Sequence, residues 1–263
     1  MDNGKEQLVK EIMQNRDFMK CPDFSKGMLE SDQQLKLPQP PVDKAAVGEI
    51  IQLPAFDDVI TCGAYADLLD IRRSVRNFSD KAATQAQLAF MLWSVQGVQG
   101  FMGETRYASK RPVPSGGARH PFEAYIAAFN VDGLKPGLYH YLPLENIGEK
   151  SVSIEFLKEI ENAGDTVVES LAGQKWAANA SFVVYFTCIA YRAEWRYSKM
   201  AHRVALIDLG HVGQNAMLSA AAMGLGSCCC AAYNTEACDK LLGVDGKDEF
   251  TVYAIPVGTP IKA

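Results

Sequence analysis

One segment limits the fold of this chain more than any other. Residues 203–226 (RVALIDLGHVGQNAMLSAAAMGLG) are apolar almost all round and rich in Gly, Ala and Ser. The run is interrupted by four polar side chains, Asp208, His211, Gln214 and Asn215. These argue against a membrane span and favour a core helix whose small residues let other backbones come close, including that of a second copy. Gly224 and Gly226 predict its C-terminal end.

Strand-like segments lie in the second half of the chain. Residues 122–131 and 137–144 are rich in β-formers, and the turn-forming sequence DGLKP joins them, so they predict a hairpin. Residues 181–190 and 250–258 are almost continuously apolar, as strands buried on both faces are.

Helical periodicity marks residues 64–73 and 84–99. In the second of these, one face is expected to carry four apolar side chains, Leu88, Met91, Leu92 and Val95. Asp80 or Thr84 can cap it. Helices that separate strands in this way predict an α+β or α/β fold with a mixed sheet.

Charge and composition narrow the class of protein. The 263 residues include 26 Lys and Arg against 31 Asp and Glu, a net charge of −5, which argues against a general affinity for nucleic acid or anionic membranes. Residues 1–49 are polar and proline-containing, so we expect an N-terminal arm followed by one domain over 50–263. The odd count of seven cysteines and the absence of a signal-peptide-like run predict reduced thiols and a cytoplasmic location.

A basic cluster follows the first predicted helix: Arg72, Arg73, Ser74 and Arg76. Three guanidinium groups and a hydroxyl within five residues can surround a phosphate. The same residues also suit a solvated basic patch at a helix C-terminus, and spacing alone favours that second interpretation.

A loop of small residues, Pro114 to Ala118, precedes the hairpin. Such a loop lets successive backbone N–H groups approach a flat or anionic ligand, and a plain turn is an equally good interpretation. It matches neither the phosphate-binding loop nor the dinucleotide fingerprint. His120, beside the glycines, is the one histidine that suggests a role in a site.

Three consecutive cysteines lie after the long apolar segment, in GLGSCCCAAYN (224–234). The spacing lacks the paired C-x-x-C of zinc sites, so we expect no metal there and interpret the thiols as buried structural side chains.

The order of these motifs along the chain says more about the family than any single motif does. Arg-Arg-Ser-x-Arg-x-Phe, then Pro-Ser-Gly-Gly-Ala-Arg-His-Pro-Phe-Glu, then a long helix ending Gly-Leu-Gly-Ser resembles the nitroreductase family of flavin enzymes over residues 50–263. The sequence GLYHY (137–141) is similar to a subgroup related to the azoline dehydrogenases of thiazole/oxazole-modified peptide biosynthesis. The resemblance implies an α+β fold of three layers, α/β/α, with a mixed, mostly antiparallel sheet and a long central helix.

The resemblance also implies a homodimer with one FMN in each of two interface clefts. Arg72 and Ser74 would hold the phosphate, Arg73 would flank it, and Arg76 would lie near flavin N1 and O2 as the catalytic residue, since its fixed charge favours reduced flavin. The partner subunit would cover the ring with four residues, Pro114, Ser115, Gly116 and Gly117. The ring near N5 and O4 would be bordered by Cys229, Cys230 and Ala231. Lys262 is the candidate for a further basic residue at the phosphate.

The function implied is that of an FMN-dependent oxidoreductase that uses NAD(P)H to reduce a small acceptor, such as a nitro compound or a quinone, by ping-pong hydride transfer. Azoline dehydrogenases use an adjacent Lys-Tyr pair as base, whereas here Tyr197 and Lys199 are separated by Ser198. Three alternatives stay open. They are a peptide azoline dehydrogenase, a flavin-fragmenting enzyme of the same fold, and a non-enzymatic flavin-binding protein whose cleft is blocked by the arm.

Overall fold

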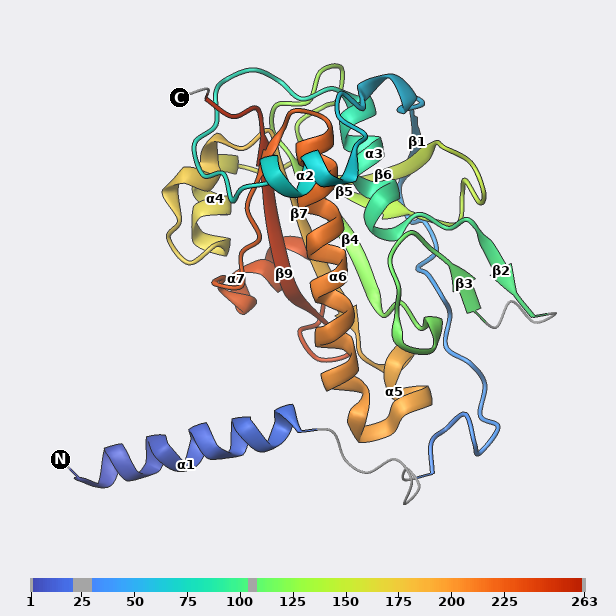
Figure 1. Cartoon of the computed structure of the whole chain (residues 1–263), viewed down its shortest axis with the longest axis vertical. Helices are drawn as coiled ribbons and strands as arrows, with labels where there is room; N and C mark the ends of the chain where they lie inside the picture. The colour runs from blue at the N-terminus through green and yellow to red at the C-terminus, as the bar shows by residue number, and fades with distance from the viewer. Residues whose placement is uncertain (1, 21–29, 104–107, 262–263) are drawn as a thin grey trace.

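The structure is a computed structural model that describes residues 2–20, 30–103 and 108–261. Its centre is a seven-stranded sheet in the order β1-β6-β5-β4-β7-β9-β8 (Figure 1). Every ladder between neighbouring strands of this sheet is antiparallel. The strands are β1 (Glu49–Leu53), β4 (Phe122–Ala128), β5 (Gly137–Leu142), β6 (Val152–Lys158), β7 (Phe182–Ile189), β8 (Gly226–Ser227) and β9 (Glu249–Gly258). A separate two-stranded ribbon comprises β2 (Gly100–Met102) and β3 (Ala108–Lys110).

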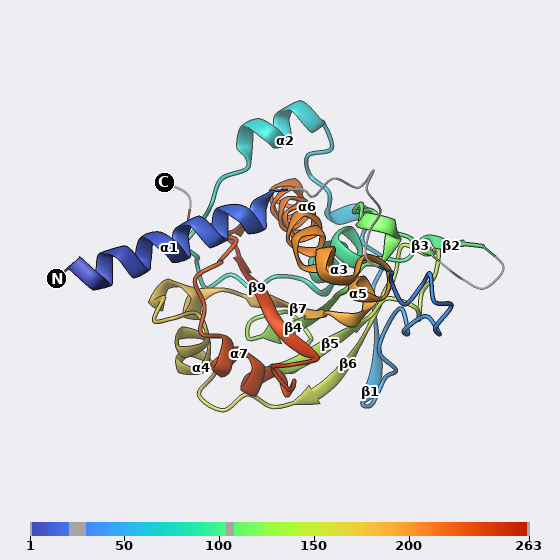
Figure 2. The same cartoon turned by 90° about the horizontal axis from the view of Figure 1, so that it is seen from below.

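Helices cover both faces of the sheet, which confirms the three-layer α/β/α prediction. Figure 2 shows α3 and α6 on one face and α4 and α7 on the other. Two clusters of buried apolar side chains fill the two interlayer spaces. The helices are α1 (Asp2–Met19), α2 (Tyr65–Ile71), α3 (Gln85–Gln96), α4 (Ala163–Ser170), α5 (Tyr191–Tyr197), α6 (Ala201–Ala222) and α7 (Thr235–Leu242).

Helix α3 begins where the sequence predicts. The Thr84 side chain accepts from the Gln87 N–H, and the Gln87 side chain accepts in return from the Thr84 N–H, so both halves of a capping box are present. All four apolar residues expected on one face of α3 are fully buried: Leu88, Met91, Leu92 and Val95. These contacts fix α3 against the sheet.

Helix α6 is the long helix that the sequence predicts, but it spans Ala201–Ala222 instead of 203–226. The Leu225 N–H donates to the Ala220 carbonyl at 2.8 Å, and Gly224 adopts a left-handed φ of 70°, so the chain turns before Gly226. Gly226 was expected to help end the helix, and it lies instead in β8. A Cβ atom there would come within 2.7 Å of Val75, so this close approach requires glycine.

The predicted hairpin and the two apolar strands are present. Strands β4 and β5 pair with Tyr125 opposite His140, and β7 lies between β4 and β9 in the middle of the sheet. The sequence analysis did not identify β1 and β6, which pair with each other at the β1 edge.

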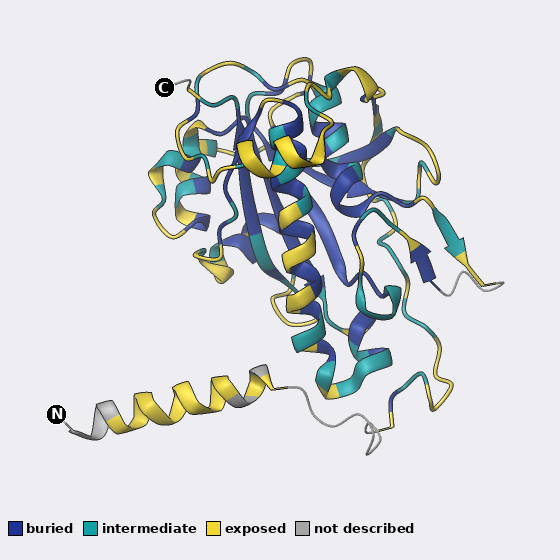
Figure 3. Cartoon of the chain, in the orientation of Figure 1, coloured by how far each residue is buried: buried dark blue, intermediate teal, exposed yellow. Residues whose placement is uncertain are grey.

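The N-terminal segment before β1 has two parts. Figure 3 shows α1 as an exposed helix that projects from the rest of the chain. Residues 30–48 run along α5 and the sheet, where the Gln33 N–H donates to the Trp195 carbonyl at 2.8 Å and Lys44 pairs with Glu249 at 2.7 Å. Of the helices that the structure describes, α1 and α6 included, none is both long and apolar enough to cross a membrane.

Candidate functional site

The structure brings the basic cluster and the cysteine segment together. The chain leaves α2 at Arg72, and Ser74 then forms a parallel bridge with Ser227 of β8. The Val75 N–H donates to the Ser227 carbonyl at 2.9 Å. Two motifs about 150 residues apart in the sequence thereby become neighbours at the β8 edge of the sheet. We call Arg72–Arg76 the arginine turn and Cys228–Ala231 the cysteine segment.

The three arginines of the arginine turn are only partly buried or exposed. Arg73 and Arg76 are exposed and Arg72 is half-buried. The Arg73 guanidinium donates to the Arg72 carbonyl at 2.8 Å, and the Arg76 guanidinium lies 5.8 Å from the centre of the Trp176 ring. No carboxylate of the described chain forms an ion pair with any of the three. Positive charge therefore accumulates here without internal compensation. Lys262 lies outside the described residues.

The cysteine segment faces the arginine turn. Cys228 and Cys230 are buried, Cys229 is half-buried and Ala231 is exposed. A hydrogen bond with the Cys230 thiol lowers the pKa of Cys228 to about 7, aided by the charge of Arg76 and a hydrogen bond with Ser74. Burial raises the pKa of Cys229 to about 11. The Cys229 thiol donates to the Gly213 carbonyl of α6 at 3.6 Å, so this side chain connects the segment to the long helix. The expected burial of the thiols is therefore confirmed for Cys228 and Cys230.

The small-residue loop is held by a buried carboxylate on α6. The Ser115 hydroxyl donates to Asp208 at 2.7 Å and accepts from the His120 N–H at 2.9 Å. The Gly116 N–H also donates to Asp208, at 3.0 Å. Burial raises the pKa of Asp208. Pro114 is exposed, and a Cβ at Gly117 would meet Arg196 and Tyr197 of α5, so α5 and α6 together hold the loop.

The loop and the arginine turn lie in different places on one chain. In Figure 1 the turn follows α2 near one end of α6, whereas the loop lies beside α5 near the other end. A single chain therefore holds the arginine turn and the cysteine segment near one end of α6, and the small-residue loop near the other end.

His120 is buried and does not face a site. Its side chain is 4% exposed, and burial together with the charge of Arg111 lowers its pKa to about 2. It is therefore a neutral structural side chain at neutral pH. Arg119, its neighbour, stacks 5.3 Å from the centre of the Trp195 ring.

Several charged side chains also meet inside the molecule, and the sequence analysis did not identify them. His140 of β5 contacts Glu155 of β6 through Nδ1 at 2.9 Å and Glu123 of β4 through Nε2 at 3.0 Å. Arg192 of α5 pairs with Glu123 at 2.6 Å. All four side chains are less than 5% exposed. We call these four residues the buried charge cluster.

The buried charge cluster also anchors the N-terminal segment. The second carboxylate oxygen of Glu155 accepts from the N–H groups of Val47 and Gly48. Burial alone would raise the pKa of Glu123, but Arg192 and His140 lower it to about 2. Burial would lower the pKa of His140, but its two glutamate partners raise it. Each charge in this cluster has a counter-charge within 3.0 Å inside the protein.

Comparison with known proteins gives a consistent result. Residues 69–259 match the model of the nitroreductase family. A protein of Methanocaldococcus jannaschii named as a nitroreductase, MJ1384, is 28% identical over 212 residues, which cover 81% of this chain and 97% of that protein. The microcin B17-processing protein McbC of Escherichia coli is 25% identical over 245 residues, covering 90% of this chain and 84% of McbC.

Two solved structures share the fold. The Escherichia coli microcin synthetase McbBCD complex with truncated pro-MccB17 bound contains a chain that aligns with a TM-score of 0.61 and 22% identity, over 100% of this chain and 95% of that one. A nitroreductase-type structure from Anabaena variabilis aligns with a TM-score of 0.60 and 23% identity over 74% of this chain. This chain spans only 38% of the Anabaena variabilis chain.

Proposed function

Because the chain belongs to the nitroreductase family, a family of flavin-dependent oxidoreductases, we propose that it binds FMN and uses NAD(P)H to reduce a small acceptor. FMN, when bound, supplies hydride transfer through its N5 atom, from the nicotinamide to a nitro compound, a quinone or a similar acceptor. One observation carries the proposal. The arginine turn lies beside the cysteine segment, and its three arginines form no ion pair with any residue that the structure describes.

The residues present suit a phosphate monoester. Arg72 and Ser74 supply a guanidinium fork and a short hydroxyl donor, and Arg73 adds a third source of charge nearby. Cys229, Cys230 and Ala231 follow β8 after Cys228 and would supply a backbone edge for the ring. Arg76 would lie near the N1 and O2 side of the ring, where its permanent charge stabilises negative charge. Its stacking on Trp176 limits its rotamers and so fixes where that charge lies.

We also propose that a second copy completes each site. Pro114, Ser115, Gly116 and Gly117 would cover the ring bound by the partner, because one chain holds this loop away from its own arginine turn. Asp208 would act as a positioning residue, since it fixes both Ser115 and Gly116. One stripe of α6 has no cover in a single chain, and its members are exposed: Leu206, Ile207, Gly210, His211 and Gln214.

Gly210 offers a direct test of the homodimer. A Cβ there meets no atom within 4 Å in one chain, so Gly210→Ala should favour the isolated helix by roughly 1 kcal/mol. If α6 packs closely against a second copy, the same change should weaken the dimer at least tenfold in sedimentation equilibrium. Gly164→Ala on α4, where a Cβ would make only an ordinary contact with Ala178, is the matched control. A dimer unchanged by Gly210→Ala contradicts packing at this stripe.

A second candidate function follows from the relatives. The similarity to McbC and to a chain of the McbBCD complex, which carries a bound pro-peptide, favours oxidation of a peptide azoline. The chain has no Lys-Tyr dipeptide. Tyr197 ends α5 beside Gly117, and Ser198, with a φ of 45°, separates it from Lys199. Reduction of a small acceptor therefore remains the first proposal.

The experiment that tests the function is an anaerobic titration of the FMN-loaded protein with NADH and with NADPH, followed by nitroaromatic, quinone and azoline-peptide substrates. Rapid bleaching by either nucleotide and reoxidation by a quinone or nitro compound supports the first proposal. Reduction only by an azoline peptide supports the second. The absence of any reduction favours a non-enzymatic flavin-binding protein, and loss of intact FMN during aerobic turnover favours flavin fragmentation.

A further inference from the structure

The N-terminal helix carries an apolar stripe that the described chain leaves uncovered. Helix α1 presents Leu8, Val9, Ile12 and Met13 on one face, because side chains three and four residues apart are neighbours on a helix. These four side chains are 42–55% exposed. All other residues from 6 to 16 are polar and exposed. We call the four apolar residues the α1 stripe.

A helix in this position needs a partner. Helix α1 has 18 residues, and most of the stability of such a helix in a protein comes from packing of its apolar face. Figures 1 and 3 show α1 projecting from the rest of the chain, so one copy does not supply this packing. The helix has three basic and four acidic residues, without the excess of positive charge that attracts a helix to an anionic membrane. A protein surface is therefore the better partner.

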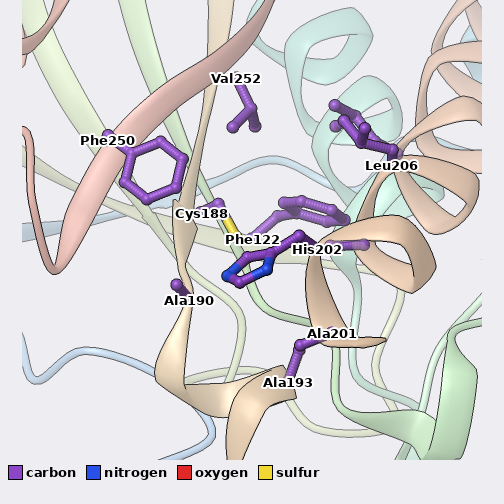
Figure 4. A pocket seen from close by; sticks show the side chains of 11 residues that line it. Phe122, Cys188, Ala190, Ala193, Ala201, His202, Leu206, Phe250 and Val252 are labelled. Atoms are coloured by element: carbon purple, nitrogen blue, oxygen red, sulfur yellow. The ribbon is translucent and has the colours of Figure 1, made fainter. Parts of the chain in front are cut away.

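An apolar cavity opens on the surface of the same chain. It has a volume of about 220 Å³ and lies between α5, the first half of α6 and strands β7 and β9. Figure 4 shows Phe122, Phe250, Val252 and Leu206 around it. Leu206 is 55% exposed, so the cavity is open to solvent beside this side chain.

Four small side chains leave space in this cavity: Ala190, Ala193, Ala201 and Ala205. Protein interiors are ordinarily packed as densely as organic crystals, so an open apolar space of this size lacks the atoms that would normally fill it. A cavity of about 150 Å³ engineered in another protein holds benzene, so this one has room for a branched aliphatic side chain. The α1 stripe offers such side chains.

The cavity borders the surface that we propose to face a second copy. Leu206 lines the cavity and also belongs to the exposed stripe of α6 that begins with Leu206 and Ile207. A second copy packed on that stripe is therefore the nearest source of apolar side chains for the cavity. In Figure 1, α1 extends away from its own chain, as an arm that is exchanged between two copies does.

The segment after α1 is anchored next to the cavity. Ser31 is buried, and the Gln33 N–H donates to the Trp195 carbonyl of α5 at 2.8 Å. Ala193 of the same helix lines the cavity. The chain from Lys20 to Ser31 spans at most about 40 Å, so α1 stays within reach of a second copy that packs on α6.

We propose that α1 of a second copy docks its stripe on this cavity, with a side chain of the α1 stripe inside it. The inference rests on the proposed homodimer and adds the surface that receives α1. By two-fold symmetry each copy donates one helix and receives one. The rival occupant is α1 of the same chain, which the same length of chain allows to fold back.

Disulfide trapping tests the contact in the full-length protein. Ile12→Cys and Leu206→Cys are made in two copies that carry different affinity tags, co-expressed and purified through both tags. Both side chains are exposed, so the substitutions leave the core unchanged. We expect mild oxidation to join positions 12 and 206 in a reducible dimer, which mass spectrometry identifies. Gln14→Cys, on the opposite face of α1, is the matched control and should give at least tenfold less product with Leu206→Cys. Each variant co-expressed with wild type measures the background from native thiols.

The outcomes separate the occupants. If the double variant Ile12→Cys/Leu206→Cys links only within one chain, α1 covers its own cavity and the exchange is overturned. Equal yields for positions 12 and 14 overturn the docking of the α1 stripe. The proposal also fails if positions 12 and 206 do not link while wild type, and not Ile12→Asp, binds vesicles of equal parts phosphatidylcholine and phosphatidylglycerol.

Self-association then tests the cavity. Ala205→Leu fills it from α6, and Ile12→Asp places a charge on the α1 stripe, so each should weaken the dimer at least tenfold in sedimentation equilibrium. Ala237→Leu on α7 and Gln14→Asp are the matched controls and should leave the dimer unchanged. Val252→Phe fills the cavity from β9 and replaces Ala205→Leu if that variant does not fold.

The same measurement distinguishes this inference from the proposed homodimer. A dimer of unchanged affinity in both Ile12→Asp and the cavity-filling variant overturns the docking and leaves the homodimer supported. A wild type that is monomeric and gives no linkage between positions 12 and 206 overturns both.

Discussion

Arg192 and Arg76 carry the same guanidinium group in two opposite surroundings. Arg192 is 4% exposed and pairs with Glu123, which in turn contacts a histidine held by a second glutamate. Arg76 is exposed, lacks a carboxylate partner among the described residues and stacks on an aromatic ring. In the first arrangement each charge is paired with an opposite charge inside the protein. The second accumulates positive charge with no carboxylate beside it, which is why we propose it as the ligand site.

The largest effect that this comparison predicts is a loss of stability when the buried charge cluster is disrupted. Arg192→Met leaves the buried Glu123 charge without its closest partner, so the free energy of unfolding should fall by about 3–5 kcal/mol. Lys150→Met is the control, because Lys150 pairs with Asp57 at 2.6 Å on the surface, where both side chains are more than half exposed. Its loss should cost no more than about 1 kcal/mol. Denaturant unfolding measures both, and equal losses would contradict the distinction between the two surroundings.

The arginine turn should show the reverse behaviour. Arg72→Ala with Ser74→Ala removes charge-assisted hydrogen bonds worth about 1.5–3 kcal/mol each, so FMN affinity should fall at least tenfold. The free energy of unfolding without FMN should stay within about 0.5 kcal/mol of wild type, because neither side chain is buried. Fluorescence titration with FMN measures the affinity. Lys150→Ala with Ser151→Ala removes one cation and one hydroxyl elsewhere and serves as the control. An unchanged affinity in the first double variant would remove the turn from the site.

Arg76 separates the two surroundings further, because its charge should change the midpoint potential of bound FMN and not the stability of the fold. A permanent guanidinium near N1 and O2 favours the reduced cofactor, which carries more negative charge than the oxidised one. Arg76→Gln should therefore lower the midpoint potential by several tens of millivolts, since about 30 mV corresponds to about 1.4 kcal/mol for two electrons. Oxidised FMN affinity should change less. Redox titration against a dye checks this, and equal potentials in mutant and wild type would place Arg76 away from the ring.

The sequence predicts the family and the central elements of the fold, whereas the assignment of site residues stays a prediction. The order of the motifs identifies the arginine turn, the small-residue loop and the cysteine segment as candidates. The closeness of Ser74 and Ser227 follows from a two-residue strand that composition does not reveal. The central strands and α3 were predictable because their apolar patterns match their burial.

The buried charge cluster could not be found in this way. Glu123, His140 and Glu155 lie on three different strands, and their meeting depends on strand register. Strand β6 has alternating apolar residues in Val152, Ile154 and Phe156, a signal that could have identified it. Trp176 gives no such signal, because it lies on a short 3-10 helix (Lys175–Asn179) about 100 residues after Arg76 in the sequence, and only the fold brings the two side chains together.

The smallest predicted effect is a pH dependence that separates the two regions. The folded pKa of His140 is raised above 6.5, so its contribution to stability is complete below about pH 6.5 and is lost as pH rises through the folded value. The folded pKa of Glu123 is about 2, below 4.5, so its contribution is complete above about pH 4.5 and is lost as pH falls. The buried charge cluster alone therefore predicts a stability maximum between about pH 4.5 and about pH 6.5.

Above about pH 6.5 the free energy of unfolding should fall by no more than about 1.4 kcal/mol per pH unit, because only the one proton of His140 is lost. Cys228 acts in the opposite direction there, because its folded pKa of about 7 lies below that of a free thiol. Comparison of wild type with His140→Gln isolates the histidine, since both proteins keep Cys228. We expect His140→Gln to lose the decline above pH 6.5, while His202→Asn, at an exposed histidine paired with Glu194, keeps it. If the decline persists in His140→Gln, the ionisation that stabilises the interior belongs to another group, and the buried charge cluster does not hold a protonated histidine.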